Sequence, residues 1–365
     1  MSWKYVLVAV SILQIVHRVK TLGQLHKTII STQDAVCNDN SRAVFYIGQR
    51  RTHNWIIFFE SGGLCSSKAD CNKRYLNKNS TVLMSSKYLP EKVIGRDILS
   101  SSKSENPTFY NYNHVLVPYC SSDLWLGKKS THRNGCFDFV NDPSVDNFSF
   151  KGHTIFRSVF KDLHKNYNIS FSEEIVVSGS SAGGIGVLNH ANWLTTNFTS
   201  YLSTKPRFLF IIDSAWFINF QDGFKSRVNS EFGKLTNISS AACADMRYGY
   251  ACCLSASCLL THHISTAMQM AFVFSLYDIY MFADVLKRLE SQGKTAENHV
   301  ADFLSAVSMY GGAMNESLEI PQRRRVSFFV PACFQHTYLS TSSLWDKDSV
   351  LQPLVEVTRD NGKFR

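Results

Sequence analysis

The chain has 365 residues, of which 44% are hydrophobic, 13% aromatic and 18% charged. This apolar fraction is enough for a core and excludes a disordered chain, and the 19 glycines and 8 prolines exclude a collagen-like or proline-rich fibre. The 38 Lys and Arg against 29 Asp and Glu give a net charge of +9. This charge favours anionic partners such as glycosaminoglycans, nucleic acid or membrane surfaces without choosing among them.

The N-terminal residues have the features of a secretory signal peptide. A start that includes Lys4 is followed by an apolar run over 5–16, broken only by a serine and a glutamine, and then by basic residues. Such a run is too short to cross a membrane comfortably and matches the apolar region of a signal peptide. We therefore expect a signal peptide over about 1–22 and a single secreted, extracellular domain over 23–365. The alternative is a buried N-terminal helix.

Short apolar runs that end in Gly, Ser, Asp or Pro alternate with helix-like stretches along the chain, without an internal repeat or low-complexity linker. Continuous apolar runs are typical of strands buried on both faces, and their alternation with helices indicates an α/β fold with a mostly parallel sheet and helices on both faces. The working groups of such sheets lie at the carboxyl ends of the strands. The expected strands are 55–59, 115–117, 174–177, 207–212, 271–276 and 326–330, the expected helices are 152–167, 186–202 and 280–292, and the Cys-rich segment 227–263 is expected to be an irregular insertion.

The cysteines and the sequons both favour an exported protein. Ten cysteines, an even number, suit a set of disulfides in an oxidising compartment, and their spacings do not match those of zinc ligands. We therefore expect neither a metal nor a cofactor. The cysteines are Cys37, Cys65, Cys71, Cys120, Cys136, Cys243, Cys252, Cys253, Cys258 and Cys333, and the predicted glycosylation sites are Asn79, Asn147, Asn168, Asn197, Asn237 and Asn315.

The segment 179–183 matches the pattern G-x-S-x-G, with Ser181 at its centre. The pattern alone is weak, but here it follows the apolar run 175–177 and precedes a helix-like run. This is the context of a nucleophile elbow, in which a sharp strand-to-helix turn exposes the serine hydroxyl above the sheet. We therefore predict Ser181 as a nucleophile in an α/β-hydrolase-like fold. The alternative is a Gly/Ser-rich turn that binds phosphate or nothing.

A nucleophilic serine needs a base and an acid that orients the base, and in this fold both follow the serine along the chain. His336 follows a strand-like run near the C-terminus and is the predicted base, whereas His190 lies inside the helix after the elbow. Two aspartates that follow expected strands compete as the acid. We predict Asp278, because the acid more often follows the second strand after the elbow, and assign Asp213 as a strand-end cap or pocket residue.

The oxyanion of an acyl-transfer intermediate needs at least two N–H donors. The residue after the nucleophile, Ala182, supplies one, and an early loop usually supplies the other through glycines. Gly62 and Gly63 follow the expected strand 55–59 and are the predicted donors. The alternative is an ordinary Gly-Gly turn.

Several of these motifs together resemble the Notum/pectin acetylesterase family. The similarity extends from about Asn38 to Trp345, and the segment 118–125, Pro-Tyr-Cys-Ser-Ser-Asp-Leu-Trp, is closer to the Notum branch than to plant pectin acetylesterases. The segments that carry the resemblance are 58–65, 105–107, 115–125, 179–184, 213–217 and 331–336.

The resemblance implies a secreted serine carboxylesterase that hydrolyses the palmitoleate ester on a serine of Wnt proteins and so inhibits Wnt signalling. It also implies binding to the heparan sulfate of glypicans. We expect no nucleic-acid partner, and no transmembrane anchor because no other long apolar stretch is present. Ser181, Asp278 and His336 fall on the family's triad, and Gly62, Gly63 and Ala182 on its oxyanion positions. By the same analogy, Cys37–Cys120 and Cys65–Cys71 are disulfides.

The sequence departs from the Notum pattern around the acyl site. Gly63 stands where Notum has a tryptophan that lines the acyl pocket, Leu64 replaces an aromatic residue, and the segment 243–258 matches poorly. Ser61 and Ala215 replace glycines. The ester chemistry therefore carries over better than the acyl-chain selectivity.

Three aromatic residues, Trp125, Trp216 and Phe217, are predicted to line the lipid pocket, although buried aromatic residues are usually ordinary core. Two other functions stay open. A polysaccharide O-acetylesterase of the pectin-esterase kind would have a shallow polar cleft, and an inactive secreted protein would bind lipid or glycosaminoglycan, though the intact triad argues against it. Basic runs that either bind glycosaminoglycan or are solvated surface are Arg323-Arg324-Arg325 and Lys128-Lys129 with Arg133.

Overall fold

The computed structural model describes residues 23–129, 148–218, 236–237, 249–294, 299–319 and 325–339. The predicted signal peptide over 1–22, the sequon at Asn147 and the basic residues Arg133, Arg323 and Arg324 lie outside these ranges. Within the described part of the chain, no helix has the length and apolar character needed to cross a membrane.

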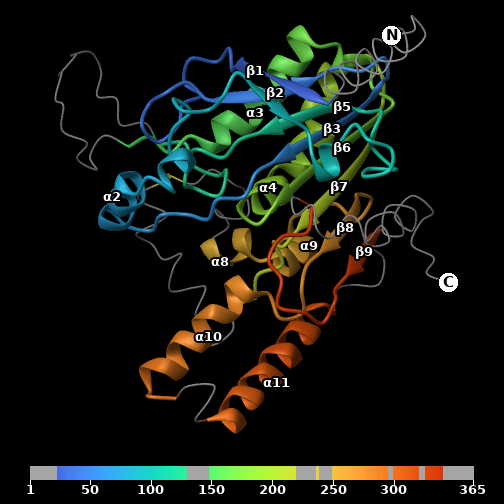
Figure 1. Ribbon diagram of the computed structural model, residues 1–365. Helices are drawn as coiled ribbons and strands as arrows, with labels where there is room; N and C mark the ends of the chain where they lie inside the picture. Colours follow the sequence, from blue (N-terminus) through green and yellow to red (C-terminus); the bar gives the residue numbers. More distant parts are fainter. Residues whose placement is uncertain are drawn as a thin grey trace, which may run out of the picture.

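A nine-stranded mixed sheet forms the centre of the molecule, with the strand order β4-β1-β2-β5-β3-β6-β7-β8-β9 (Figure 1). The run from β5 to β9 is parallel, whereas β4, β1 and β2 pair antiparallel at one edge. The predicted mostly parallel α/β sheet is therefore confirmed. The strands are β1 (Gln24–Ile29), β2 (Val44–Gly48), β3 (Asn54–Phe59), β4 (Lys92–Ile94), β5 (Asn113–Val117), β6 (Glu174–Ser180), β7 (Arg207–Asp213), β8 (Gln269–Val273) and β9 (Val326–Phe329).

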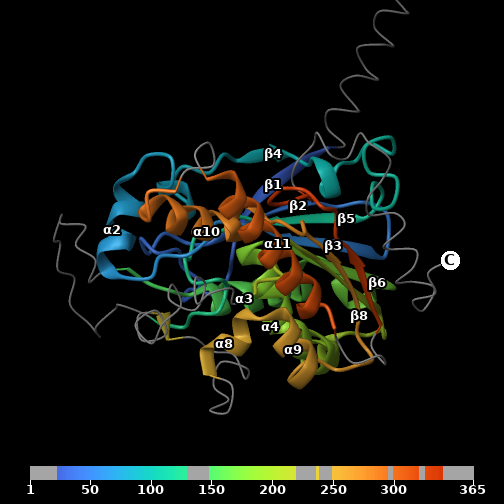
Figure 2. The ribbon, with the colours of Figure 1, turned by 90° about the horizontal axis from the view of Figure 1, so that it is seen from below.

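Helices α3, α4, α8 and α9 lie on the same side of the sheet, as the view from below shows (Figure 2). Helices α10 and α11 project away from the sheet as a pair, and α2 lies at one side of the molecule (Figure 1). The helices are α2 (Lys68–Leu76), α3 (Gly152–Asn166), α4 (Ala182–Thr196), α8 (Gly249–Leu254), α9 (Ala256–His262), α10 (Ile279–Ser291) and α11 (Val300–Ser317), with short 3-10 helices η1 (Thr81–Leu83), η2 (Asp97–Leu99), η4 (Ile169–Phe171) and η5 (Phe198–Tyr201).

The central strands are apolar at consecutive positions because both of their faces are buried. In β3, Ile57 and Phe59 belong to the cluster that includes the apolar side of α3 and α4. Ile56 and Phe58 belong to a second cluster, which includes the chain around η2. Phe156 of α3 stacks on the ring of Phe59 with 4.0 Å between centroids, so the helix is fixed directly above the strand that leads to the predicted oxyanion turn.

All six predicted strands and the three predicted helices are present, with shifted ends. The expectation of an irregular insertion over 227–263 is wrong for its second half, where α8 and α9 form and the disulfide Cys252–Cys258 links them. The side chain of Ser255 caps α9 by accepting a hydrogen bond from the N–H of Cys258. The sequence did not indicate these helices, because the closely spaced cysteines in this segment suggested a disulfide-linked loop.

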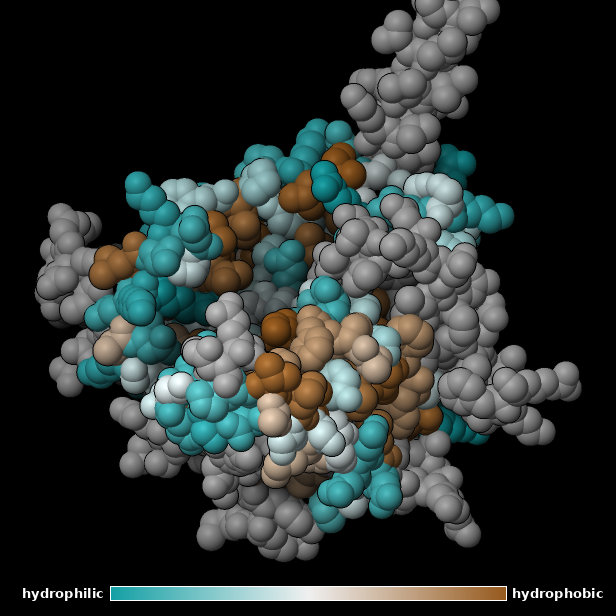
Figure 3. Space-filling view, turned by 60° about the horizontal axis from the view of Figure 1, so that its bottom comes forward, coloured by the Kyte–Doolittle hydropathy of each residue, from teal (hydrophilic) through white to brown (hydrophobic). Residues whose placement is uncertain are grey.

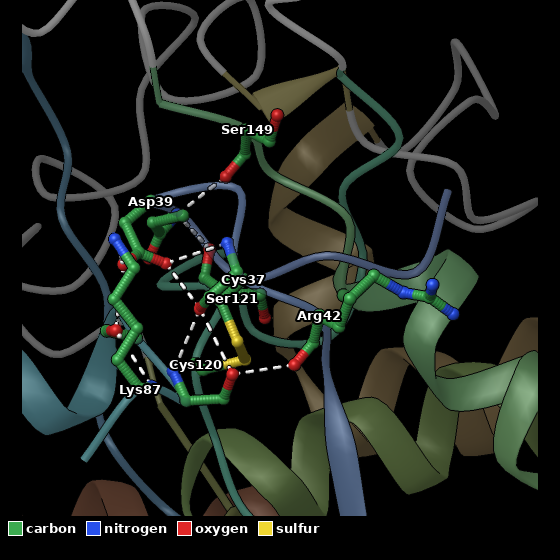
Figure 4. Close-up of a disulfide and its surroundings, with 12 residues drawn as sticks. Cys37, Asp39, Arg42, Lys87, Cys120, Ser121 and Ser149 are labelled. Atoms are coloured by element: carbon green, nitrogen blue, oxygen red, sulfur yellow. Dashed lines mark hydrogen bonds and ion pairs between the residues drawn. A yellow bond between two sulfur atoms is a disulfide. The ribbon is translucent and has the colours of Figure 1, made fainter. Parts of the chain in front are cut away.

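Three disulfides join described residues: Cys37–Cys120, Cys65–Cys71 and Cys252–Cys258. The first two are the pairs that the family resemblance implied. Figure 4 shows Cys37–Cys120, which ties the segment before β2 to the chain that follows β5. Beside it the backbone N–H of Asn38 donates to the Cys120 carbonyl at 2.9 Å, and Lys87 forms an ion pair with Asp39 at 3.0 Å.

Hydrophobic side chains gather on the face of the molecule from which α10 and α11 project (Figure 3). Val300, Leu304 and Met309 of α11 are more than half exposed. The inner sides of the two helices meet through Phe282, whose ring contacts Phe303 and Tyr310. The helix pair therefore has its own small aromatic core and leaves apolar residues on its outer surface.

Candidate active site

Ser181 lies in the sharp turn between β6 and α4. Its backbone has φ 51° and ψ −114°, a conformation that costs free energy in a residue with a side chain and is typical of a nucleophile elbow. The N–H of Ser181 donates to the carbonyl oxygen of Asp213 on the neighbouring strand at 2.7 Å, which holds the turn in place. The side chain stands at the positive end of the 15-residue helix α4, where negative charge is stabilised.

The last glycine of the pattern, Gly183, allows α4 to begin directly against the end of β3. A Cβ atom at this position would lie 2.1 Å from the carbonyl oxygen of Phe59 and 2.9 Å from that of Glu60. Only glycine fits so close a backbone approach. The start of α4 therefore lies against the chain that leads into the turn of Gly62 and Gly63.

His336 lies in the loop after β9, and its Nδ1 is 2.7 Å from Oδ2 of Asp278. Asp278 precedes α10, and its other oxygen accepts the N–H groups of Tyr280 at 2.9 Å and Met281 at 3.3 Å. The His336 ring stacks on that of Tyr280 with 5.2 Å between centroids, and 18% of its side chain is exposed. The structure therefore pairs the predicted base with the predicted acid and leaves the base accessible.

The competing aspartate, Asp213, does not contact the imidazole of His336 through a described hydrogen bond. Its buried carboxylate accepts the backbone N–H groups of Tyr338 and Leu339, each at 3.0 Å. His190 lies within α4 as predicted, where its Nδ1 contacts the carbonyl of Gly186 at 2.8 Å, and burial lowers its pKa to about 3. Asp213 is therefore not placed to orient the predicted base, and His190 is not placed to act as the base.

Side chains behind the predicted oxyanion turn hold its carbonyl groups. Tyr119 donates to the carbonyl of Gly63 at 2.8 Å, Arg74 donates to that of Gly62, and Trp125 Nε1 donates to that of Glu60 at 3.2 Å. These bonds fix the peptide planes of the turn. Sequence reasoning missed the roles of Arg74 and Tyr119, although Tyr119 lies in the segment 118–125 that carries the family resemblance.

The disulfide Cys65–Cys71 closes a small loop directly after the predicted oxyanion turn. It links the residue that follows Leu64 to α2, the helix that also carries Arg74. Ser67 caps this helix by accepting the N–H of Asp70 at 3.2 Å. The turn is therefore held both by the disulfide that follows it and by the bond from Tyr119 to Gly63.

Gly63 has φ +67°, in the left-handed region that glycine adopts without strain. A Cβ atom there would face the hydroxyl of Tyr280 at 3.8 Å and Nη1 of Arg74 at 3.9 Å. The space beside Gly63 is therefore bordered by two polar groups. The sequence indicated only that a tryptophan is absent at this position.

The three aromatic residues predicted to line a lipid pocket occupy core positions. Trp125 has no exposed area, packs against Phe59 and donates to the carbonyl of Glu60 before the predicted oxyanion turn, so its contact with substrate stays a prediction. Trp216 packs among the aromatic rings of β8 and β9, and Nε1 of Trp216 donates to Ser317 at 2.8 Å. Trp216 and Phe217 are both buried, and their contact with an acyl chain stays a prediction.

Two carboxyl groups near the turn, the partly buried Glu60 and the fully buried Asp123, have raised pKa values. Burial raises the pKa of Glu60 to about 7, against a smaller opposing effect from the N–H of Tyr119. Burial likewise raises the pKa of Asp123 to about 6, although Ser121 and three backbone N–H groups donate to it. The turn is thus built on carboxyl groups that titrate near neutral pH.

Among the described sequons, the asparagines are exposed at Asn79, Asn168, Asn197, Asn237 and Asn315. A glycan needs such exposure, so each position is sterically open to modification. The described residues hold no group of three or more His, Cys, Asp or Glu side chains arranged to bind a metal ion. The described cysteine outside a disulfide is Cys333, near His336.

The parallel strands, the elbow at Ser181 and the contact between His336 and Asp278 place the protein in the α/β-hydrolase class. A family model described as Pectinacetylesterase matches residues 19–357, and the chain belongs to this family. The family resemblance seen in the sequence is thereby confirmed.

Named relatives of the chain are palmitoleoyl-protein carboxylesterases. The notum2 protein of Xenopus laevis is 35% identical over 184 residues, which are 50% of this chain and 35% of that protein. The NOTUM protein of Homo sapiens is 31% identical over 192 residues, or 52% of this chain and 36% of that protein. The matched regions thus span about a third of the length of these relatives.

A crystal structure of the Wnt deacylase Notum from Drosophila has the same fold. It superposes with a TM-score of 0.71 and 24% sequence identity, covering 88% of this chain and 87% of that one. This similarity confirms the architecture of the sheet and helices well beyond the regions that match in sequence.

Proposed function

We propose that the chain is a secreted serine carboxylesterase that removes palmitoleate from a serine of Wnt proteins and so inhibits Wnt signalling. The observation that carries the proposal is the 2.7 Å contact between His336 and Asp278, on a fold that also presents Ser181 in an elbow. The named activities of the relatives and of the Drosophila Notum structure support the choice of substrate.

The proposed reaction follows from the roles of the three side chains. Asp278 holds the proton of His336 on Nδ1, so that Nε2 can take the proton of the Ser181 hydroxyl as its oxygen attacks the ester carbonyl. The alcohol of the substrate serine leaves with that proton. Water then attacks the acyl-enzyme by the same route and releases the fatty acid.

The negative charge of each intermediate would rest on the N–H groups of Gly62, Gly63 and Ala182. One well-placed donor is worth about 3–4 kcal/mol of transition-state stabilisation. The bonds from Arg74 and Tyr119 to the carbonyls of the turn support this role, because a donor contributes most when it does not reorganise during the reaction.

A second candidate is a polysaccharide O-acetylesterase. The polar groups of Arg74 and Tyr280 beside Gly63 favour it, because they would suit a hydrated sugar better than an alkyl chain. The family description, Pectinacetylesterase, agrees with this chemistry. Both candidates use the same three catalytic residues and differ in the acyl group and the alcohol.

The test compares both substrates on the same secreted protein. An O-palmitoleoylated Wnt peptide and an acetylated pectin are incubated with wild type and with Ser181→Ala, and released acid is measured by mass spectrometry. Ser178→Ala is the matched control, since its hydroxyl donates to the Ile211 carbonyl within the sheet. Palmitoleate release that is lost only in Ser181→Ala supports the first proposal, acetate release alone supports the second, and no release of either acid refutes both.

The binding of heparan sulfate on glypicans is part of the same proposal. Lys128, which is exposed, and Arg325 contribute to the two basic runs noted in the sequence. Retention on heparin at physiological salt, reduced in a Lys128→Glu and Lys129→Glu variant, would support this partner. Equal retention of the variant would remove this pair of lysines from the proposed site.

A further inference from the structure

Asp213 contacts the elbow that carries Ser181 through both its backbone and its side chain. Its carbonyl oxygen accepts the N–H of Ser181 at 2.7 Å. Its carboxylate accepts the hydroxyl of Ser180, which lies opposite it in the register of β6 and β7. The aspartate is completely buried at the end of β7.

The same carboxylate also holds the loop that carries His336. Both of its oxygens accept the N–H of Tyr338 at 3.0 Å, and Oδ2 accepts the N–H of Leu339 at 3.0 Å. The adjacent Ser214 donates to Oδ1 at 2.9 Å and accepts the N–H of Thr337 at 2.9 Å. The three residues that follow His336 are therefore all bonded to Asp213 or Ser214.

We propose that Asp213 is a positioning residue that sets His336 relative to Ser181, an inference that rests on the proposed esterase function. One buried side chain joins the strand turn of the nucleophile to the loop of the base, although the two segments are more than 150 residues apart in sequence. Asp278 holds the imidazole itself, whereas Asp213 holds the backbone from which the imidazole extends. Asp278 thus orients the ring of His336, and Asp213 positions the loop that carries it.

A separate contact keeps the loop in the fold when Asp213 is changed. Ser275, which follows β8, accepts the N–H of Gln335 at 3.2 Å and contacts the hydroxyl of Tyr338 at 2.5 Å. Loss of the Asp213 carboxylate should therefore shift the loop locally. A displacement of about 1 Å in a catalytic group costs about 100-fold in rate.

The experiment compares Asp213→Ala with Asp213→Asn on an ester substrate such as a p-nitrophenyl ester. The alanine should lower kcat about 100-fold and leave KM within about threefold, because the substrate does not touch this residue. The asparagine should restore part of the rate. Its amide oxygen in the place of Oδ2 can still accept from Ser180, Tyr338 and Leu339, whereas its NH2 group in the place of Oδ1 cannot accept the second bond from Tyr338 or the bond from Ser214.

The matched control is Asp162→Ala, which removes another buried carboxylate that accepts a backbone N–H, that of Ser31 at 2.7 Å. Both alanine variants should unfold at lower temperature, but only Asp213→Ala should lose kcat. If Asp213→Ala is not secreted in folded form, Ser214→Ala replaces it. This variant loses the bond from Thr337 and the bond to Oδ1 of Asp213 but keeps the bonds from Tyr338 and Leu339, so it should lower kcat less, by about fivefold.

A spectroscopic measurement separates this inference from the esterase proposal. The downfield proton resonance of the His336–Asp278 hydrogen bond, assigned by its loss in His336→Gln, should shift or broaden in Asp213→Ala and persist in Asp162→Ala. A wild type without esterase activity would refute the proposed function, and this resonance would still test the positioning. A folded Asp213→Ala with unchanged kcat, or an unchanged resonance where the wild type is inactive, would overturn the inference.

Discussion

Replacement of Asp278 by asparagine should reverse the orientation of the His336 ring protons. Oδ1 of Asp278 accepts the N–H groups of Tyr280 and Met281, so the amide oxygen of an asparagine would take that position. Its NH2 group would then face Nδ1 of His336 in place of Oδ2, which is 2.7 Å away. Because two donors cannot face each other, Nδ1 must accept and the ring proton moves to Nε2.

The imidazole would then present an N–H where it needs a lone pair. It could no longer take the proton of Ser181, although its position would hardly change. The equivalent change in serine proteases costs about 10⁴-fold in kcat, which corresponds to about 5 kcal/mol of transition-state stabilisation. We expect a loss of this size for Asp278→Asn, with KM nearly unchanged and the fold intact.

The assay is kcat on a p-nitrophenyl ester and on the palmitoleoylated peptide, after circular dichroism has established that the variant is folded. Asp302→Asn is the matched control, because Asp302 of α11 forms an ion pair at 3.1 Å with Lys294, which follows α10. It should retain wild-type kcat. An Asp278→Asn enzyme that kept more than about a tenth of the wild-type kcat would refute the tautomer reasoning.

Three further predictions concern stability. The pKa of Glu60 is raised from 4.5 to about 7, so the folded protein binds this proton more tightly than the unfolded chain does. The protonated carboxyl group therefore contributes to the free energy of unfolding below about pH 4.5, and this contribution is lost as the pH rises through 7. The melting temperature of Glu60→Gln minus that of wild type should therefore increase between pH 4.5 and 7, and a constant difference would contradict this. Replacing both Cys37 and Cys120 by alanine opens a loop of 83 residues and should lower the free energy of unfolding by about 4–5 kcal/mol in urea titrations, whereas an unchanged midpoint would show that the link is not formed. Gly183→Ala forces a Cβ to 2.1 Å from a backbone oxygen, so it should abolish secretion of folded protein, and normal yields would be inconsistent with the close approach.

The strands of the parallel sheet could be predicted because their sequences are apolar at consecutive positions. The edge strands could not be predicted in this way. In β1 only Leu25 is buried, and β4 has three residues with no buried side chain among them. Helix α11 escaped prediction because it is apolar on most sides and contains Gly311 and Gly312, which disfavour a helix. Because apolar residues lie on its exposed side as well as its buried side, the sequence of α11 shows no clear helical periodicity.

The site could be predicted as far as the chemistry requires particular residue types in a fixed chain order. The choice between Asp213 and Asp278 depended on the path of the loop after β9, which no local pattern encodes. The support of the oxyanion turn by Arg74 and Tyr119 was equally inaccessible, since it arises from contacts between distant segments. The burial of Trp125 could not be predicted either, because the sequence of an aromatic residue in a pocket does not differ from that of one in the core.

The small loop closed by Cys65 and Cys71 makes the geometry of the predicted oxyanion turn depend on whether these two cysteines have been oxidised. Closing a loop of this length restricts the unlinked chain by about 2 kcal/mol, equivalent to roughly a 30-fold change in the fraction that is ordered. A newly made chain whose thiols are still reduced would lack that restriction, and Arg74 would be less firmly held against Gly62. Oxidation of this one cysteine pair would then be the step that fixes the position of α2, and with it Arg74, relative to the turn.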